Sequence, residues 1–119
     1  MPTSGSRLRV KRDGDITQVE FVDRNILDEA NIQQIGEEIT GLIETSSGPK
    51  LLISFSNVDH LSSAALGTLI TINNKVKNKG GKLRLANIDP QIYEVFKITK
   101  LDKLFQIHDT TERAMASFR

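Results

Sequence analysis

Apolar and polar residues alternate with a period of two in the first part of the chain, after a small, polar start. Leu8 and Val10 alternate with arginine and lysine, and the same alternation returns from about Ile16 to Val22. This period is typical of half-buried strands. Asp13-Gly14 separates the two runs and is a strong hairpin signal, because glycine accepts the positive φ of a tight turn. We predict two antiparallel strands, preceded by a flexible tail at residues 1–6.

Two longer segments place apolar residues three and four positions apart, the spacing of one face of an α-helix. The first runs from about Asp28 to Thr45 and ends at Ser46-Ser47-Gly48-Pro49, where glycine suits a helix end and proline cannot continue the helix. The second runs from about Ser63 to Asn78 and ends at Gly80-Gly81. The expected buried stripes are Ile32, Ile35, Ile39 and Leu42 or Ile43 in the first helix, and Ala65, Leu69, Ile72 and Val76 in the second.

The remaining elements are shorter. The nearly continuous apolar run 51–55 is typical of a central strand covered on both faces, and the run 82–86 alternates as another strand. Pro90 suits the first turn of a helix, and a compact apolar turn and a short strand are expected to follow it. Asp109 and Glu112 resemble a capping box before a last helix. The expected inner positions are Ile92, Val95, Phe96 and Thr99, then Leu101, Leu104, Phe105 and Ile107, then Ala114, Met115 and Phe118.

Strands and helices therefore alternate along most of the chain, a pattern that indicates an α/β fold with parallel neighbouring strands. We predict one domain over residues 7–119. It should contain a mixed, mostly parallel sheet of four to five strands, with an N-terminal hairpin and four to five helices.

Composition narrows the function classes. The chain has 119 residues, a net charge of +1 and no cysteine, so one domain is expected, and disulfides, thiolate metal sites and cysteine nucleophiles are excluded. Neither a signal peptide nor an apolar run long enough to span a membrane is present in the sequence. The near-neutral charge gives no general attraction to nucleic acid or anionic lipid. We expect a cytoplasmic protein.

Functional loops of open α/β sheets gather at the carboxyl ends of the parallel strands. Three loops leave predicted strands there, at residues 23–27, 56–62 and 87–89. The second loop is long and polar and leads directly into a helix, so Ser62 or Ser63 must lie in that helix's first turn. Unpaired N–H groups and the helix dipole favour an anion at such a position, but serine is also an ordinary N-cap residue. The residues alone leave both interpretations open.

The segment His60-Leu61-Ser62-Ser63-Ala64-Ala65-Leu66-Gly67 resembles the signature loop of STAS domains, in particular those of bacterial anti-sigma factor antagonists. The glycine turn Asn78-Lys79-Gly80-Gly81-Lys82-Leu83 is similar to the one that precedes a strand in that family. Its proline-led helix resembles the segment 89–96, and its following turn resembles 101–105. The resemblance covers essentially Leu8 to Phe118.

This resemblance implies a binding protein with a switchable serine and without catalytic activity or a cofactor. The family's regulated serine corresponds to Ser63, which a partner kinase that is also the anti-sigma factor phosphorylates and a phosphatase restores. The resemblance also places partner contacts at Asp28, Asp59, His60, Leu61, Ser62 and Ala64. Asp28 is matched through Leu27-Asp28, which is similar to the Leu-Asp pair opening the family's first helix, although a carboxylate there also suits the helix dipole.

Three positions depart from the family's usual pattern. Ser62 replaces an aspartate, Ala64 replaces a second serine or threonine, and Ala65 replaces a glycine. These departures favour an alternative in which the fold is kept without the switch. The chain would then be a constitutive scaffold, or a subunit of a larger assembly such as a stress complex or a lipid-transport ATPase.

Other signals are weak. The two histidines, His60 and His108, have no nearby histidine or cysteine partner, so a metal site is not expected. His108 is expected at an exposed position before a helix cap. A relay of Ser63, His60 and Asp59 lacks the sequence of a nucleophile elbow. Neither a P-loop nor a nucleic-acid motif is present, and the lysines near residues 75–82 suit a solvated face.

Overall fold

The computed structural model describes residues 8–45 and 47–118, so the tail predicted at residues 1–6 lies outside the described residues. Strands and helices alternate along the described chain, with one short 3₁₀ helix (η1) after the third α-helix. The elements are β1 Leu8–Asp13, β2 Ile16–Phe21, β3 Asn25–Ile26, α1 Glu29–Glu44, β4 Lys50–Ser54, β5 His60–Leu61, α2 Ser63–Asn78, β6 Lys82–Ala86, α3 Pro90–Ile98, η1 Leu101–Lys103, β7 Gln106–His108 and α4 Thr111–Ala116.

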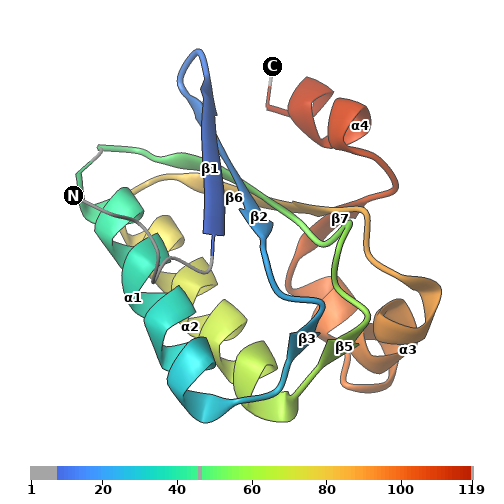
Figure 1. Cartoon of the computed structure of the whole chain (residues 1–119). Helices are drawn as coiled ribbons and strands as arrows, with labels where there is room; N and C mark the ends of the chain where they lie inside the picture. The colour runs from blue at the N-terminus through green and yellow to red at the C-terminus, as the bar shows by residue number, and fades with distance from the viewer. Residues whose placement is uncertain (1–7, 46, 119) are drawn as a thin grey trace.

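Five strands form the main sheet, in the order β1-β2-β4-β6-β7. β1 and β2 pair antiparallel, whereas β2, β4, β6 and β7 are parallel to one another. Figure 1 shows α1 and α2 lying side by side on one side of this sheet and α4 on the other. The predicted α/β fold, with a mixed, mostly parallel sheet and an N-terminal hairpin, is confirmed.

A two-residue turn connects β1 to β2. Gly14 has a φ of +63°, whereas the φ of Asp15 is not positive. This combination suits a type II′ turn, in which the first central residue is glycine. The predicted hairpin is therefore confirmed, and Asp13 and Ile16 are the pair that closes the turn.

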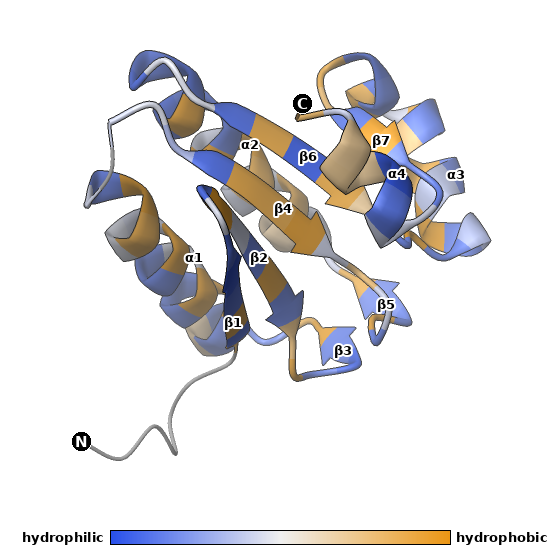
Figure 2. Cartoon of the chain, turned by 90° about the horizontal axis from the view of Figure 1, so that it is seen from above, coloured by the Kyte–Doolittle hydropathy of each residue, from blue (hydrophilic) through white to orange (hydrophobic). Residues whose placement is uncertain are grey.

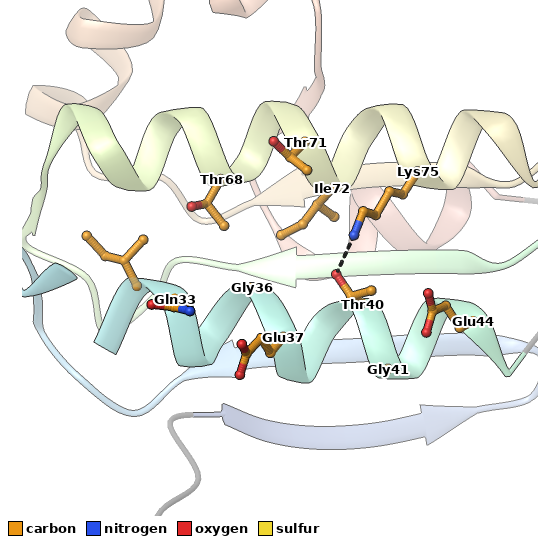
Figure 3. Close-up of a pocket in the computed structure, with 11 residues that line it drawn as sticks. Gln33, Gly36, Glu37, Thr40, Gly41, Glu44, Thr68, Thr71, Ile72 and Lys75 are labelled. Carbon is orange, nitrogen blue, oxygen red and sulfur yellow. Dashed lines mark hydrogen bonds between the residues drawn. The ribbon is translucent and has the colours of Figure 1, made fainter. Parts of the chain in front are cut away.

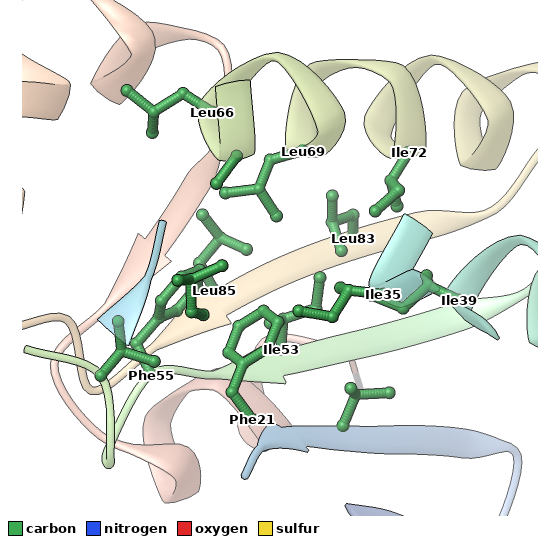
Figure 4. Close-up of a cluster of buried hydrophobic side chains, with 14 of the residues drawn as sticks. Phe21, Ile35, Ile39, Ile53, Phe55, Leu66, Leu69, Ile72, Leu83 and Leu85 are labelled. Carbon is green, nitrogen blue, oxygen red and sulfur yellow. The ribbon is translucent and has the colours of Figure 1, made fainter. Parts of the chain in front are cut away.

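The larger part of the core lies between the sheet and the helices α1 and α2. Leu51 and Ile53 of β4 point into this layer, while Leu52 between them points to the opposite face. All three are almost inaccessible, at 2%, 0% and 0% exposure, which confirms that β4 is covered on both faces. Figure 2 shows β4 as a largely apolar strand in the middle of the sheet, and Figure 4 shows the packed side chains.

The two long helices bury the stripes that their periodicity predicts. Ile43, and not Leu42, completes the α1 stripe, because Leu42 is only half-buried. Gly48 lies shortly before β4, and Gly80-Gly81 lies directly before β6. The buried residues are Ile32, Ile35, Ile39 and Ile43 in α1, and Ala65, Leu66, Leu69, Ile72, Asn73 and Val76 in α2.

A second, smaller core lies under α4. Ala114, Met115 and Phe118 pack on Ile16, Leu52 and Ala86. The N-cap of α4 is Thr110, whose hydroxyl oxygen accepts a hydrogen bond from the Arg113 amide at 3.1 Å. The predicted capping box at Asp109 and Glu112 is therefore wrong by one residue, because Asp109 precedes the residue that caps the helix.

Two further expectations need correction near the carboxyl end. In α3 only Ile92 and Phe96 are buried, whereas Val95 is 40% exposed and Thr99 is exposed. A nine-residue helix over the border of the sheet presents only one i, i+4 pair to the core. His108, expected at an exposed position, is half-buried in β7. Its buried Nε2 has no hydrogen-bond partner within the described part of the chain.

In the described ranges no helix has both the length and the apolar content that crossing a bilayer requires.

Candidate functional site

Two segments that the sequence treats as polar loops pair with each other. β3 and β5 form a separate two-stranded parallel sheet, in which Ile26 lies opposite Leu61. The Arg24 carbonyl accepts hydrogen bonds from the amides of Asp59 at 2.7 Å and His60 at 3.2 Å, and the Ile26 carbonyl accepts one from the Ser62 amide at 3.1 Å. The connection from β2 to α1 is thereby tied to the connection from β4 to α2.

An ion pair reinforces this tie at the surface. The Arg24 guanidinium donates from Nε to Oδ2 of Asp59 at 2.9 Å. Their side chains are 71% and 46% exposed, so solvent screens the attraction and its contribution to stability is small. Its effect is geometric, since it holds the side chain of Asp59 against the neighbouring loop. Arg24 was not predicted as a site residue, because a single arginine in a polar segment gives no signal.

The paired loops bring the first turns of α1 and α2 to the same end of the molecule, as Figure 1 shows. Asp28 is the N-cap of α1, and its Oδ1 accepts hydrogen bonds from the amides of Ala30 at 2.8 Å and Asn31 at 3.4 Å. Ser62 is the N-cap of α2. Two helix N-termini therefore face solvent from the same rim, which favours negative charge there.

The structure distinguishes the two candidate serines. Ser62 has extended backbone angles, and its Oγ accepts a hydrogen bond from the Ala65 amide at 3.2 Å, so it is the capping residue. Ser63 is the first residue of the helix and is exposed. Its hydroxyl makes no hydrogen bond to any of residues 8–45 and 47–118. The ordinary structural role thus belongs to Ser62, and the hydroxyl of Ser63 is accessible to a partner.

The other predicted contact residues lie in the paired loops and the first turns of α1 and α2, but they are not equally available. His60 and Ala64 are exposed, Asp59 is half-buried in its ion pair, and Leu61 packs against the large core. The carboxylate of Asp28 is exposed although it caps α1. We call this surface the docking rim, and it comprises Asp28, Asp59, His60, Leu61, Ser62, Ser63 and Ala64.

An exposed apolar residue adjoins the docking rim and was missed as a site residue. Leu27 is 55% exposed and lies between Ile26, which pairs with Leu61, and the cap residue Asp28. A single exposed aliphatic side chain is ordinary on a protein surface, so only its position beside the docking rim makes Leu27 a candidate contact. In the sequence, only the apolar character of Leu27 could have indicated it, because Leu27 belongs neither to the alternating pattern of the preceding strand nor to the buried stripe of α1.

A groove of about 380 Å³ runs along the outer side of α1 and α2. Figure 3 shows the Lys75 ammonium donating a hydrogen bond across it to the Thr40 hydroxyl, at 3.4 Å. None of the residues of the docking rim lines this groove. The candidate site is therefore a surface at the helix N-termini and not this hollow.

The docking rim is suited to binding and to carrying an anion. The start of α2 still has backbone N–H groups without a helical acceptor, which would stabilise a phosphate on Ser63. In residues 8–45 and 47–118 no three histidine or carboxylate side chains gather as metal ligands would.

We expect Ser62→Ala to lower the free energy of unfolding by about 1 kcal/mol, because it removes the side-chain acceptor of the Ala65 amide. Urea unfolding followed by circular dichroism would measure this change. Ser63→Ala is the matched control and should change the stability by less than about 0.5 kcal/mol, as is usual for an exposed side chain. Equal losses in the two variants would contradict the assignment of Ser62 as the cap.

Comparisons with known proteins agree on a single family. The family model described as the STAS domain matches residues 8–114. The anti-sigma-B factor antagonist of Bacillus subtilis is 30% identical over 76 residues, which cover 64% of this chain and 68% of that protein. Among solved structures, an anti-sigma-factor antagonist (STAS) domain protein from Planctomyces limnophilus superposes with a TM-score of 0.84 at 22% identity, covering 92% of this chain and 96% of the other.

A second solved structure, the Bacillus cell fate determinant SpoIIAA in its phosphorylated form, superposes with a TM-score of 0.69 at 18% identity. The superposition covers 94% of this chain and 99% of that one. At these identities both solved structures support the fold.

Proposed function

The chain belongs to the STAS domain family, and on this basis we propose that it is a regulator of the anti-sigma factor antagonist type, which acts by binding another protein and not by catalysis. The observation that carries the proposal is the accessible hydroxyl of Ser63 in the first turn of α2, which makes no hydrogen bond within the described residues and lies beside a different serine that caps the helix. The proposed regulator consists of one domain, residues 7–119, works in the cytoplasm and needs no cofactor.

The proposed partner is a serine kinase that is also the anti-sigma factor. It would dock on the docking rim and phosphorylate Ser63, and a phosphatase would remove the phosphate. The phosphorylated form of SpoIIAA, whose fold superposes on this chain, supports a phosphate on this type of domain. The resemblance of segment 60–67 to the family's signature loop points to Ser63 as its position.

Electrostatics explain how such a switch would act. A phosphate adds a charge of about −1.5 to −2 at neutral pH. The N-terminus of α2 tolerates this charge on the free protein, so the fold does not have to change. At a contact surface, however, the same charge would face apolar or acidic groups of the partner and would weaken the complex.

A second candidate keeps the docking rim but not the switch. The supporting observation is the side chain of Ala65, which is only 5% exposed and occupies a position where the family usually has glycine. Together with the neutral Ser62 cap, it makes the start of α2 differ from the usual phosphorylated loop. In this candidate the chain is a constitutive scaffold, or a subunit of a stress complex or a lipid-transport ATPase.

Phosphorylation assays would separate the two candidates. The unmodified chain is incubated with ATP and with each kinase-type anti-sigma factor encoded in its source genome, and the phosphate is mapped by mass spectrometry. We expect one phosphate at Ser63 with a single kinase, and none in Ser63→Ala. If no kinase modifies Ser63, or if the phosphate appears on Ser62, the switch is abandoned and the scaffold is retained.

A further inference from the structure

The first strand of the sheet lies at its border. Within residues 8–45 and 47–118, β1 pairs only with β2, because it is the terminal strand in the order β1-β2-β4-β6-β7. Five of its six residues are exposed. Figure 2 shows it as a strongly hydrophilic strand at the border of the sheet. An open strand edge is a template for a further strand unless its sequence prevents this pairing.

The hairpin fixes which backbone groups of β1 face outward. The two-residue turn makes Asp13 and Ile16 a hydrogen-bonded pair, and hydrogen-bonded and non-bonded pairs alternate along an antiparallel ladder. Lys11 and Arg9 therefore bond to β2, opposite Gln18 and Glu20. The N–H and C=O groups of Val10 and Arg12 point away from β2, so the edge offers two donors and two acceptors in register.

The side chains on this edge are mostly cationic. Nη1 of Arg9 lies 3.6 Å from Oε1 of Glu20, and the arginine side chain of this ion pair is 70% exposed. Lys11 and Arg12 are exposed, and neither forms an ion pair with any of residues 8–45 and 47–118. Val10 is 46% exposed. Because side chains alternate along a strand, cationic groups project on both faces of the edge.

These charges select against a second copy of the chain. If two β1 strands paired antiparallel around Lys11, the two Lys11 side chains would lie opposite each other, and Asp13 would offset only the charge of Arg9. Like charges at opposite positions destabilise a sheet. The same cations would attract carboxylates on an added strand. The edge is thus complementary to an extended acidic segment.

We propose that β1 binds an extended, acidic segment of another protein as a sixth strand of the sheet. The backbone groups of Val10 and Arg12 supply the hydrogen bonds, and Lys11 and Arg12 pair with its carboxylates. β-strand addition of this type takes its affinity from main-chain bonds and its specificity from side chains. This site is separate from the docking rim and does not depend on the phosphorylation of Ser63.

The first test uses the whole chain, labelled with nitrogen-15, and a ten-residue peptide of glutamate, valine and threonine. Titration should shift the amide signals of Val10 and Arg12 and slow their hydrogen exchange at least about tenfold. A peptide with lysine in place of glutamate should not bind. A peptide with alternate amides N-methylated cannot form the ladder and should bind at least about tenfold more weakly.

Two variants assign the effect to the strand edge. Val10→Pro removes an outward N–H donor and keeps the bonds to β2, since proline is tolerated where an edge N–H faces solvent. This variant should weaken peptide binding about tenfold, and Val10→Thr is its control.

Replacing both Lys11 and Arg12 with glutamine should also weaken peptide binding about tenfold and should reduce the dependence of the affinity on salt. The charge-matched control replaces Lys77 of α2 and Lys103 of η1, both exposed and outside β1, with glutamine.

Several outcomes would overturn the proposal. These are no binding of the acidic peptide at millimolar concentration, equal binding of the N-methylated peptide, or a dimer of the free chain that Val10→Pro dissociates. If Val10→Pro does not fold, the N-methylated peptide decides the question with the unmodified chain.

Discussion

We expect Ser63→Asp to weaken the binding of the proposed partner kinase roughly a hundredfold and to leave the fold intact. The new carboxylate lies in the middle of the docking rim, at the exposed first residue of α2. An unpaired or like-charged group at a protein contact costs several kcal/mol, and about 3 kcal/mol corresponds to roughly a hundredfold in Kd. At the N-terminus of a helix the carboxylate is favourable by about 0.3–1 kcal/mol, so the melting temperature should hardly change.

Two controls distinguish the effect of a negative charge at residue 63 from the effect of losing the serine or of adding a charge elsewhere on α2. Ser63→Ala should bind the kinase as tightly as the unmodified chain and should accept no phosphate. Asn74→Asp adds the same charge at an exposed position further along α2 and should leave the affinity unchanged. Calorimetric titration measures all three. If Ser63→Asp binds as tightly as Asn74→Asp, charge at Ser63 does not control docking.

Gly81→Ala should lower the free energy of unfolding by about 3 kcal/mol, the upper part of the usual range for overpacking. Gly81 lies between the end of α2 and the start of β6. A methyl group there would overlap the Pro49 carbonyl oxygen and would lie 2.8 and 2.9 Å from Cδ and Cγ of the same proline. Pro49 cannot move away freely, because it is buried and its carbonyl accepts a hydrogen bond from the Lys82 amide at 2.8 Å.

The neighbouring glycine is the matched control. Gly80 has a φ of +72°, but an added Cβ would meet no atom within 4 Å. Gly80→Ala should therefore cost only the strain of a left-handed backbone, about 1 kcal/mol. Urea unfolding of both variants tests the difference. A smaller loss for Gly81→Ala than for Gly80→Ala would mean that the turn at Pro49 yields easily.

The parts of the fold that the sequence predicts correctly are those with several repeats of one period. The stripe of α1 repeats over four buried isoleucines and fixes both the helix and its inner face. The run at β4 is apolar at consecutive positions, so its burial on both faces follows directly. In α3 the stripe has only two buried residues, Ile92 and Phe96. The sequence pattern alone could not show that the apolar Val95 lies outside this stripe.

The sequence predicts which segments contain the candidate site, but it does not predict how their residues are arranged. The approach of α1 and α2 at one rim depends on β3 and β5, and two residues per strand are too few to show any period. The choice between Ser62 and Ser63 as the cap depends on backbone angles, which the sequence cannot distinguish because both residues are serine. The same ambiguity of one position explains the error at Asp109 and Thr110, since both are good capping residues.

The tie between β3 and β5 also decides which parts of the rim can fluctuate alone. One carbonyl, that of Arg24, accepts both the Asp59 and the His60 amide, and the next bond of the series joins Ile26 to Ser62. A local opening of either loop breaks bonds that the other loop needs, so the two form a single cooperative unit. We therefore expect local opening of residues 24–26 to affect how long Ser63 stays in its helical position, although α1 separates the two segments along the chain.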